Sequence, residues 1–183
     1  MVYEPGEDSF LLKKHVKDNA QGLVLDMGTG SGIQAKEAAR SSKVKKIYAV
    51  DIDPEAVNYC KRKVKNKKIV CKRSDLFDVF KQLKKKPRFD LIIFNPPYLP
   101  EDKRLRDLTL DGGKKGYELT IKFLRQGKSF LQKNGKILLL FSSLTNKKKI
   151  DKTLKQLKLK HKLLDSEMHF FEELYVYLIE KKK

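Results

Sequence analysis

The chain lacks the features of several protein classes. Its 183 residues contain no tryptophan and only two cysteines, Cys60 and Cys71. Two thiols are too few for a disulfide framework and indicate a reducing compartment. No apolar run reaches the roughly 18 residues needed to cross a bilayer, and the first residues hold no basic region followed by an apolar one, so no secretory signal is predicted. We therefore expect a cytoplasmic protein without membrane contact.

Metal-ligand patterns are also missing. No spacing of cysteine and histidine matches a zinc site, and His15, His161 and His169 stand far apart in the sequence. We expect no metal site in this chain, and structural or surface roles for the three histidines.

Positive charge dominates the composition. The chain has 42 lysines and arginines against 23 acidic residues, a formal net charge of +19, and 35 of the basic residues are lysines. Such a charge attracts RNA, DNA or a ribonucleoprotein. A lysine-rich composition is also typical of hyperthermophile proteins without any binding role. The lysines are scattered and few aromatics lie among them, which favours the second explanation.

Short apolar strands alternate with helical segments along the whole chain. This alternation predicts βαβ units with right-handed crossovers and a mostly parallel sheet. The predicted strands are 23–26, 46–51, 68–72, 89–94, 137–141, 160–169 and 174–180. The predicted helices are 7–18, 33–40, 54–65, 76–84, 116–131 and 149–157, with Asn134-Gly135 as a turn and Asp75 as a candidate cap of the fourth helix.

The fold class expected from this order is α/β. We predict a Rossmann-like, seven-stranded sheet with helices on both faces, in a single domain over residues 1–183 with no separate substrate domain. No helix separates the last two strands, so they should pair antiparallel.

A glycine loop follows the first predicted strand. Gly28, Gly30 and Gly32 alternate with small residues and open a helix. Glycines in this context let a ligand approach the backbone, and the helix start favours a carboxylate or phosphate. No Lys-Ser/Thr pair follows in P-loop register, so a nucleoside triphosphate is disfavoured. The remaining alternative is a tight turn without a ligand.

Acidic residues end the next two strands. Asp51, followed by Ile52, comes about twenty residues after the glycines, where a carboxylate can accept hydrogen bonds from both ribose hydroxyls. Asp53 precedes Pro54 and is expected to cap a helix. Asp75 can accept from an exocyclic amine while Leu76 packs on the ring.

The run Asn95-Pro96-Pro97-Tyr98 follows the fourth strand. Carboxyl ends of parallel strands bind ligands in open α/β sheets. The Asn95 side-chain oxygen and the Pro96 carbonyl can accept the two N–H bonds of a planar amide or amine, Pro97 restricts the turn, and Tyr98 can pack against the flat group. The four motifs should therefore line one cleft.

These residues resemble class I S-adenosylmethionine-dependent methyltransferases. Enzymes with an Asn-Pro-Pro-Tyr motif methylate planar nitrogens of adenine, cytosine or glutamine. The start, residues 2–12, is similar to the HemK-like branch found in archaea and eukaryotes, which methylates the glutamine of the Gly-Gly-Gln motif in class I release factors. Asp111-Gly112-Gly113 and Glu172-Glu173-Leu174 fit the same branch, and the resemblance covers the whole chain.

The resemblance implies a role for each motif. Ser9, Asp26 and the glycine loop would hold the methionine end of the cofactor, Asp51 the ribose, and Asp75 with Leu76 the adenine. The family often works with a small zinc-binding activator on the third strand, here Ile69–Cys71, although flanking lysines could protect that edge without a partner. Methylation of a nucleic-acid base is the alternative activity, and a catalytically silent scaffold is a further one.

Overall fold

The computed structural model describes residues 4–99 and 112–182. Its strands are β1 (Gly22–Met27), β2 (Val44–Asp51), β3 (Ile69–Arg73), β4 (Phe89–Phe94), β5 (Leu131–Ser142), β6 (Leu159–Met168) and β7 (Glu173–Lys181). Its helices are α1 (Glu7–Asn19), α2 (Ile33–Ala39), α3 (Pro54–Lys63), α4 (Asp78–Lys81), α5 (Glu118–Phe130), α6 (Lys147–Gln156) and the 3-10 turn η1 (Ser143–Thr145).

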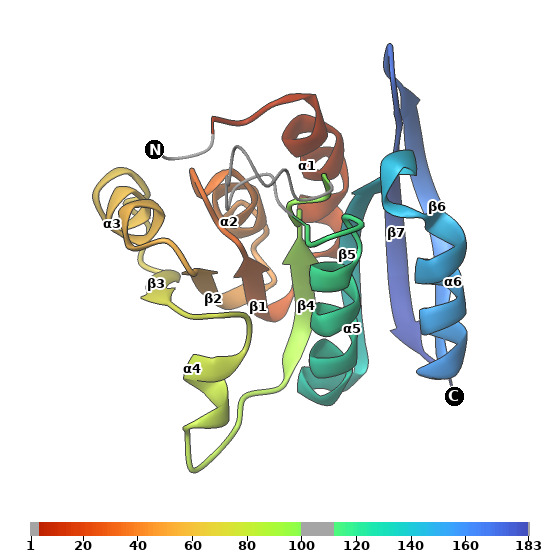
Figure 1. Ribbon diagram of the computed structural model, residues 1–183. Helices are drawn as coiled ribbons and strands as arrows, with labels where there is room; N and C mark the ends of the chain where they lie inside the picture. The colour runs from red at the N-terminus through yellow and green to blue at the C-terminus, as the bar shows by residue number, and fades with distance from the viewer. Residues whose placement is uncertain (1–3, 100–111, 183) are drawn as a thin grey trace.

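The strands form one seven-stranded sheet in the order β3-β2-β1-β4-β5-β7-β6 (Figure 1). β7 runs antiparallel to both of its neighbours, and the pairs among β3, β2, β1, β4 and β5 are parallel. The predicted fold class and the antiparallel pairing of the last two strands are therefore confirmed. Strand order reverses between β1 and β4, which is where open α/β sheets bind ligands, beyond the carboxyl ends of the strands.

Two apolar cores cover the two faces of the sheet. On one face Phe77, Phe123 and Phe130 pack with alternate residues of β1, β4 and β5, and Phe77 stacks on Phe130 with ring centroids 4.7 Å apart. On the other face α1 and α2 pack with the intervening residues of the same strands, through Leu12 and Ala38 among others. Side chains of a strand alternate between the two faces of the sheet, so a near-continuous apolar strand such as β4 contributes side chains to both cores.

Two predicted elements differ in the structure. The helix expected over 76–84 is reduced to α4, because Leu76 has a positive φ of 45° and the Ser74 hydroxyl accepts from the Val79 amide. The like-charged run 84–86 and the following proline do not support its continuation. Asp75 therefore does not cap a helix beginning at Leu76.

The second difference lies at the start of β5. Asn134-Gly135 was expected to be a turn before a strand at 137, but α5 passes directly into β5 at Leu131. Phe89 pairs with Leu131 and Leu91 pairs with Lys136, so a register shift absorbs the residues between them. The predicted turn is thus an irregularity inside a longer strand.

None of the helices among residues 4–99 and 112–182 has the length and apolar character needed to cross a membrane.

Candidate functional site

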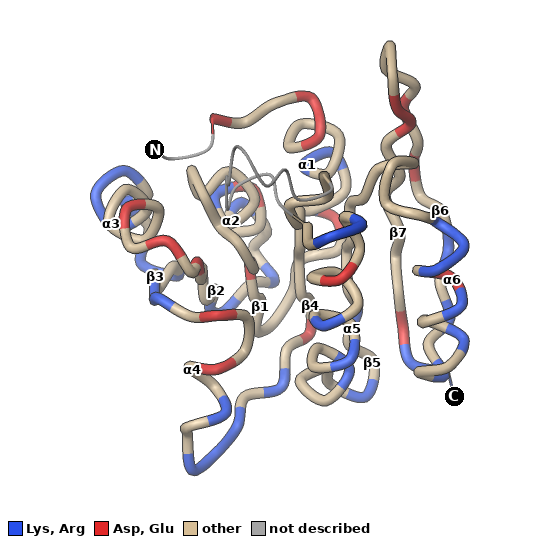
Figure 2. Tube along the Cα trace, in the orientation of Figure 1, with Lys and Arg blue, Asp and Glu red and all other residues tan. Residues whose placement is uncertain are grey.

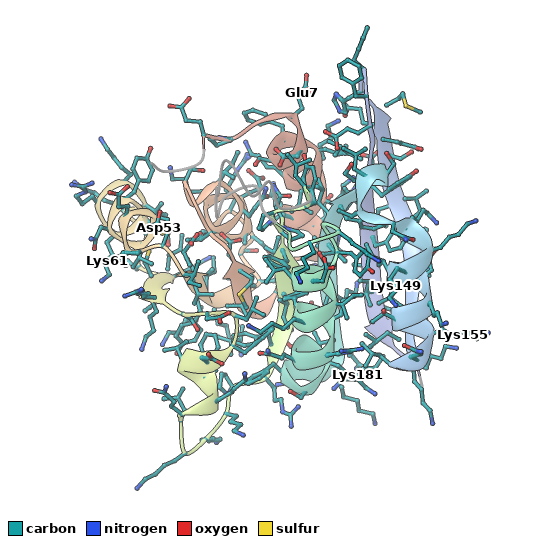
Figure 3. All side chains as sticks on the ribbon, in the orientation of Figure 1. Glu7, Asp53, Lys61, Lys149, Lys155 and Lys181 are labelled. Atoms are coloured by element: carbon teal, nitrogen blue, oxygen red, sulfur yellow. The ribbon has the colours of Figure 1, made fainter. Side chains whose placement is uncertain are left out.

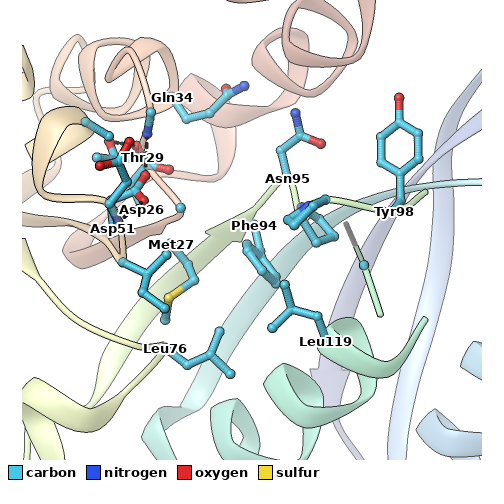
Figure 4. Close-up of a pocket in the computed structure, with 18 of the residues that line it drawn as sticks. Asp26, Met27, Thr29, Gln34, Asp51, Leu76, Phe94, Asn95, Tyr98 and Leu119 are labelled. Carbon is cyan, nitrogen blue, oxygen red and sulfur yellow. Dashed lines mark hydrogen bonds between the residues drawn. The ribbon is translucent and has the colours of Figure 1, made fainter. Parts of the chain in front are cut away.

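A cavity of about 1480 Å³ lies at the carboxyl ends of β1, β2 and β4. Figure 4 shows Asp26, Thr29 and Asp51 on one side of it, Asn95 and Tyr98 on the other, and Leu76 and Phe94 between them. The predicted site residues that line it are Ser9, Asp26, Gly28, Gly30, Asp51, Ile52, Asp75, Leu76, Asn95, Pro96, Pro97 and Tyr98. Residues from four separate motifs therefore meet in one place. Asp111 lies outside the described residues.

Gly32 is the predicted residue that does not line the cavity. A Cβ on Gly32 would lie 2.5 Å from a methyl carbon of Val64, so this glycine is required by the packing of the loop against the chain after α3. Gly30 differs, because a Cβ there would meet no atom within 4 Å and would occupy the cavity side. Both residues have a positive φ, which favours glycine.

The Asp26 side chain hydrogen-bonds to both the glycine loop and α2. Its Oδ2 accepts hydrogen bonds from the Thr29 hydroxyl at 2.6 Å and from the Ala35 amide at 3.1 Å. The residue is 1% exposed, and this burial raises the pKa of the Asp26 carboxyl to about 7. Thr29 was not predicted as a site residue, although its place between two loop glycines and three residues after an aspartate was a usable signal.

Asp51 connects the glycine loop to the start of α3. Its two carboxylate oxygens accept from the Gly30 amide at 2.9 Å and from the Asp53 amide at 3.0 Å. Burial raises the pKa of Asp51 above its usual value. Asp53 caps α3 by accepting from the Glu55 amide, as predicted. Each Asp51 oxygen keeps capacity for another donor, so a ligand with two neighbouring hydroxyls suits it.

Leu76 and Leu119 give one end of the cavity an apolar wall, and Asp75 lies beside Leu76. The Asp75 carboxylate pairs with the Lys122 ammonium of α5 at 3.1 Å. Lys122 also lines the cavity, together with Leu119. The positive φ of Leu76 is an unusual backbone state for a branched residue and directs this residue into the lining. A flat ring can lie here between leucine side chains, with Asp75 at its polar edge.

Asn95 is held by the first turn of α1. Its Nδ2 donates to Asp8 Oδ2 at 2.9 Å, and Ser9 Oγ lies 3.5 Å from the same nitrogen. An aspartate carboxylate only accepts, so it fixes which end of the amide faces α1. The Asn95 Oδ1 is buried and has no hydrogen-bond partner in the described part of the chain. A buried acceptor without a partner is unfavourable, which favours a donor brought by a ligand.

Gln34 provides a second acceptor of this kind. Its Nε2 donates to the Ser9 carbonyl at 2.9 Å, while its buried Oε1 finds no partner among the described residues. Asp8 and Gln34 both line the cavity and neither was predicted. Their contacts to Asn95 and Ser9 span 87 and 25 positions, so no local pattern could reveal them.

The cavity is acidic although the chain is strongly basic. Its described lining contains one lysine, Lys122, against nine acidic residues: Glu4, Asp8, Asp26, Asp51, Asp53, Glu55, Asp75, Glu118 and Glu172. In Figure 2 lysines and arginines colour much of the loop after α4 and much of α6, and Figure 3 shows Lys61 and Lys155 pointing outward on opposite sides. This distribution suits a ligand with cationic groups or hydrogen-bond donors.

Comparison with known proteins identifies the family. The family model for the methyltransferase small domain matches residues 6–170. The chain belongs to this family. A protein of Methanocaldococcus jannaschii named as a putative protein N5-glutamine methyltransferase is 39% identical over 96% of this chain and 89% of its own length. Methyltransferase HEMK2 of Mus musculus is 30% identical over 84% of this chain and 78% of its own.

A solved structure supports the fold. The E. cuniculi Mtq2–Trm112 complex, described as responsible for methylation of the termination factor eRF1, matches with a TM-score of 0.77 and 22% identity, over 99% of both chains. Family and fold together imply that this methyltransferase uses S-adenosylmethionine.

Asp26 makes the stability of this methyltransferase depend on pH. The pKa of its carboxyl is about 7 in the folded state against 3.8 for the unperturbed group. Ionisation of Asp26 therefore favours the unfolded state increasingly as pH rises from about 4 to 7. Asp26→Asn removes this titrating group. The difference in free energy of unfolding between this variant and the wild type should therefore be roughly 2 to 3 kcal/mol more in favour of the variant at pH 8 than at pH 5.

Urea unfolding at both pH values measures this difference. Asp18→Asn makes the same chemical change at an exposed position of α1 and serves as the matched control. An equal effect of Asp26→Asn at the two pH values would show that the buried carboxyl does not titrate in this range.

Proposed function

We propose that this chain is an S-adenosylmethionine-dependent N-methyltransferase that acts on the glutamine side-chain amide of the Gly-Gly-Gln motif of a class I release factor. The observation that carries the proposal is the Asn95 amide, whose nitrogen is held by Asp8 and whose buried oxygen has no partner in the described chain. An acceptor presented in this way suits the N–H of a planar amide. The name of the M. jannaschii relative agrees with a glutamine substrate, and the description of the E. cuniculi complex agrees with a translation termination factor as the methylated protein.

The lining residues fit the cofactor. Asp51 would accept from the ribose hydroxyls, Leu76 would pack on the adenine, and Asp75 would accept from its exocyclic amine. Ser9, Asp26 and the glycine loop lie at the methionine end. There the unpaired Gln34 Oε1 suits an ammonium group. When bound, S-adenosylmethionine supplies an electrophilic methyl group on a sulfonium.

The Asn-Pro-Pro-Tyr run orients the target nitrogen. An amide nitrogen is a weak nucleophile because its lone pair is delocalised into the carbonyl. Asn95 Oδ1 and the Pro96 carbonyl accept its two N–H bonds, which fixes the direction of attack and stabilises the positive charge that develops on nitrogen. Pro96 and Pro97 keep the acceptors in place, and Tyr98 packs against the flat group.

Electrostatics disfavour the alternative of a nucleic-acid base. A flipped base brings its phosphates close to the pocket, and the described lining of the pocket is acidic, with Glu4, Glu118 and Glu172 among its residues. A polypeptide that donates N–H groups meets no such repulsion. A contact of the basic outer surface with RNA or a ribonucleoprotein remains the less favoured of the two explanations for the net charge of +19.

The edge strand β3 is the proposed site of an activator. β3 ends the sheet, and Ile69, Val70 and Cys71 are each half-buried. An open strand edge can pair with another chain. A small zinc-binding subunit is the partner we propose here, in line with the two-protein complex named for the E. cuniculi structure.

A radiolabelled methyl-transfer assay tests the proposed substrate. The purified chain, with and without a zinc-binding partner, is offered a release factor, its Gly-Gly-Gln glutamine-to-alanine variant, bulk RNA and bulk DNA. We expect label in the release factor alone, and none in the alanine variant. Label in nucleic acid but not in the release factor would reverse the assignment, and no label in any arm would favour a silent scaffold.

Two substitutions separate substrate orientation from cofactor binding. Asn95→Ala removes the acceptor oxygen and should lower methyl transfer by roughly 100-fold or more, with S-adenosylmethionine affinity by calorimetry within several-fold of wild type. Asp51→Ala should instead weaken that affinity by about 10-fold or more, because two hydrogen bonds to a charged acceptor are lost. Wild-type turnover by Asn95→Ala would refute the orientation role.

Asp8 is expected to act through Asn95. In Asp8→Asn the new side-chain amide can donate as well as accept, so it no longer fixes the orientation of the Asn95 amide. The maximal rate of methyl transfer should fall by roughly 10-fold, while cofactor affinity should stay within about threefold of wild type. Asp18→Asn, at an exposed position of the same helix, is the control. A loss of cofactor affinity equal to the loss of rate would assign Asp8 to cofactor binding instead.

A further inference from the structure

The turn between β6 and β7 carries the three most exposed large apolar side chains of the described chain. We define the hairpin tip as residues 168–172. Within it Met168 is 74% exposed, Phe170 93% and Phe171 85%. Figure 1 shows this tip projecting past the sheet, at the end where β4 terminates and α1 begins. Exposed aromatics in a cluster are unfavourable in water and mark sites of protein contact.

The hairpin tip is fixed to the rest of the fold. The ring of His169 bonds through Nδ1 to the Glu7 carboxylate of α1 at 2.8 Å, and its backbone amide donates to the Glu172 carbonyl at 2.7 Å. The Glu173 amide donates to the Ser143 hydroxyl of η1. The two phenylalanine rings contact edge to face with centroids 4.8 Å apart. The aromatics are therefore presented by a turn whose backbone is held on both sides.

The hairpin tip is continuous with the cavity. Glu172 lines the cavity, and its buried Oε2 has no hydrogen-bond partner in the part of the chain that the structure describes. The residue before it is the exposed Phe171. A polypeptide whose side chain enters the cavity can thus donate to Glu172 and continue directly onto the two aromatic rings.

We propose that the hairpin tip docks the folded body of the protein substrate, next to the loop that carries its glutamine. Phe170 and Phe171 are the apolar anchors, and Glu172 Oε2 accepts a backbone N–H or a basic side chain of the entering segment. This proposal rests on the proposed function. Glu167, Glu172 and Glu173 flank the aromatics in the chain, and Glu7 bonds to His169, which precedes Phe170. A phosphate-rich surface such as RNA or an anionic membrane does not suit this acidic surrounding.

The test is the double variant F170S/F171S, assayed with the intact release factor. Loss of two exposed anchors should raise KM for the release factor by roughly 10-fold or more. The maximal rate at saturating substrate should stay within about twofold, and affinity for S-adenosylmethionine by calorimetry should not change. Leu163→Ser, an exposed apolar position on β6 of the same hairpin, is the control and should leave KM unchanged.

Each outcome has one meaning. If the wild-type chain does not methylate the release factor, the proposed function fails and this proposal falls with it. If the wild type is active and the double variant keeps the wild-type KM, the docking proposal alone is overturned. A lower maximal rate with unchanged KM overturns it as well. The proposal is also overturned if sedimentation shows a dimer for the wild type and a monomer for the double variant while KM is unchanged. That result would assign the hairpin tip to self-association.

Discussion

The geometry of the cavity depends on one buried carboxylate near the carboxyl end of β1. Asp26 accepts from Thr29 and Ala35, so a single side chain joins β1, the glycine loop and α2. Burial disfavours the ionised form of the Asp26 carboxyl and therefore raises its pKa. An uncharged polar residue could make similar contacts with less loss of stability. The acid at this position is explained better by a cationic ligand group than by the fold alone.

The local charge of the cavity and the net charge of the chain point to different partners. Surface charges separated by more than about 8 Å are largely screened at physiological salt. The outward lysines therefore contribute little to the field inside the cavity, which is determined by the acidic residues of its lining.

Sequence reasoning succeeded where a motif follows a strand. Parallel strands bring their carboxyl ends to one edge, so Asp51, Asp75 and Asn95 meet without any knowledge of their contacts. It failed where the backbone departs from its local preference. Leu76 adopts a positive φ and shortens α4, and a register shift extends β5 through Asn134-Gly135. It also missed Asp8 and Gln34, because their partners are far away in the chain.

The first turn of α1 connects the parts of the site that sequence order separates. Asp8 and Ser9 lie beside Asn95, and the Ser9 carbonyl holds Gln34 at the cofactor end. Glu7 of the same turn bonds His169 in the hairpin tip. Three consecutive residues thus contact Asn95, which is the proposed acceptor for the target amide, the Gln34 wall of the cavity and the exposed aromatic turn. A shift of this helical turn would move all three together, so α1 couples the proposed docking turn to the proposed amide acceptor.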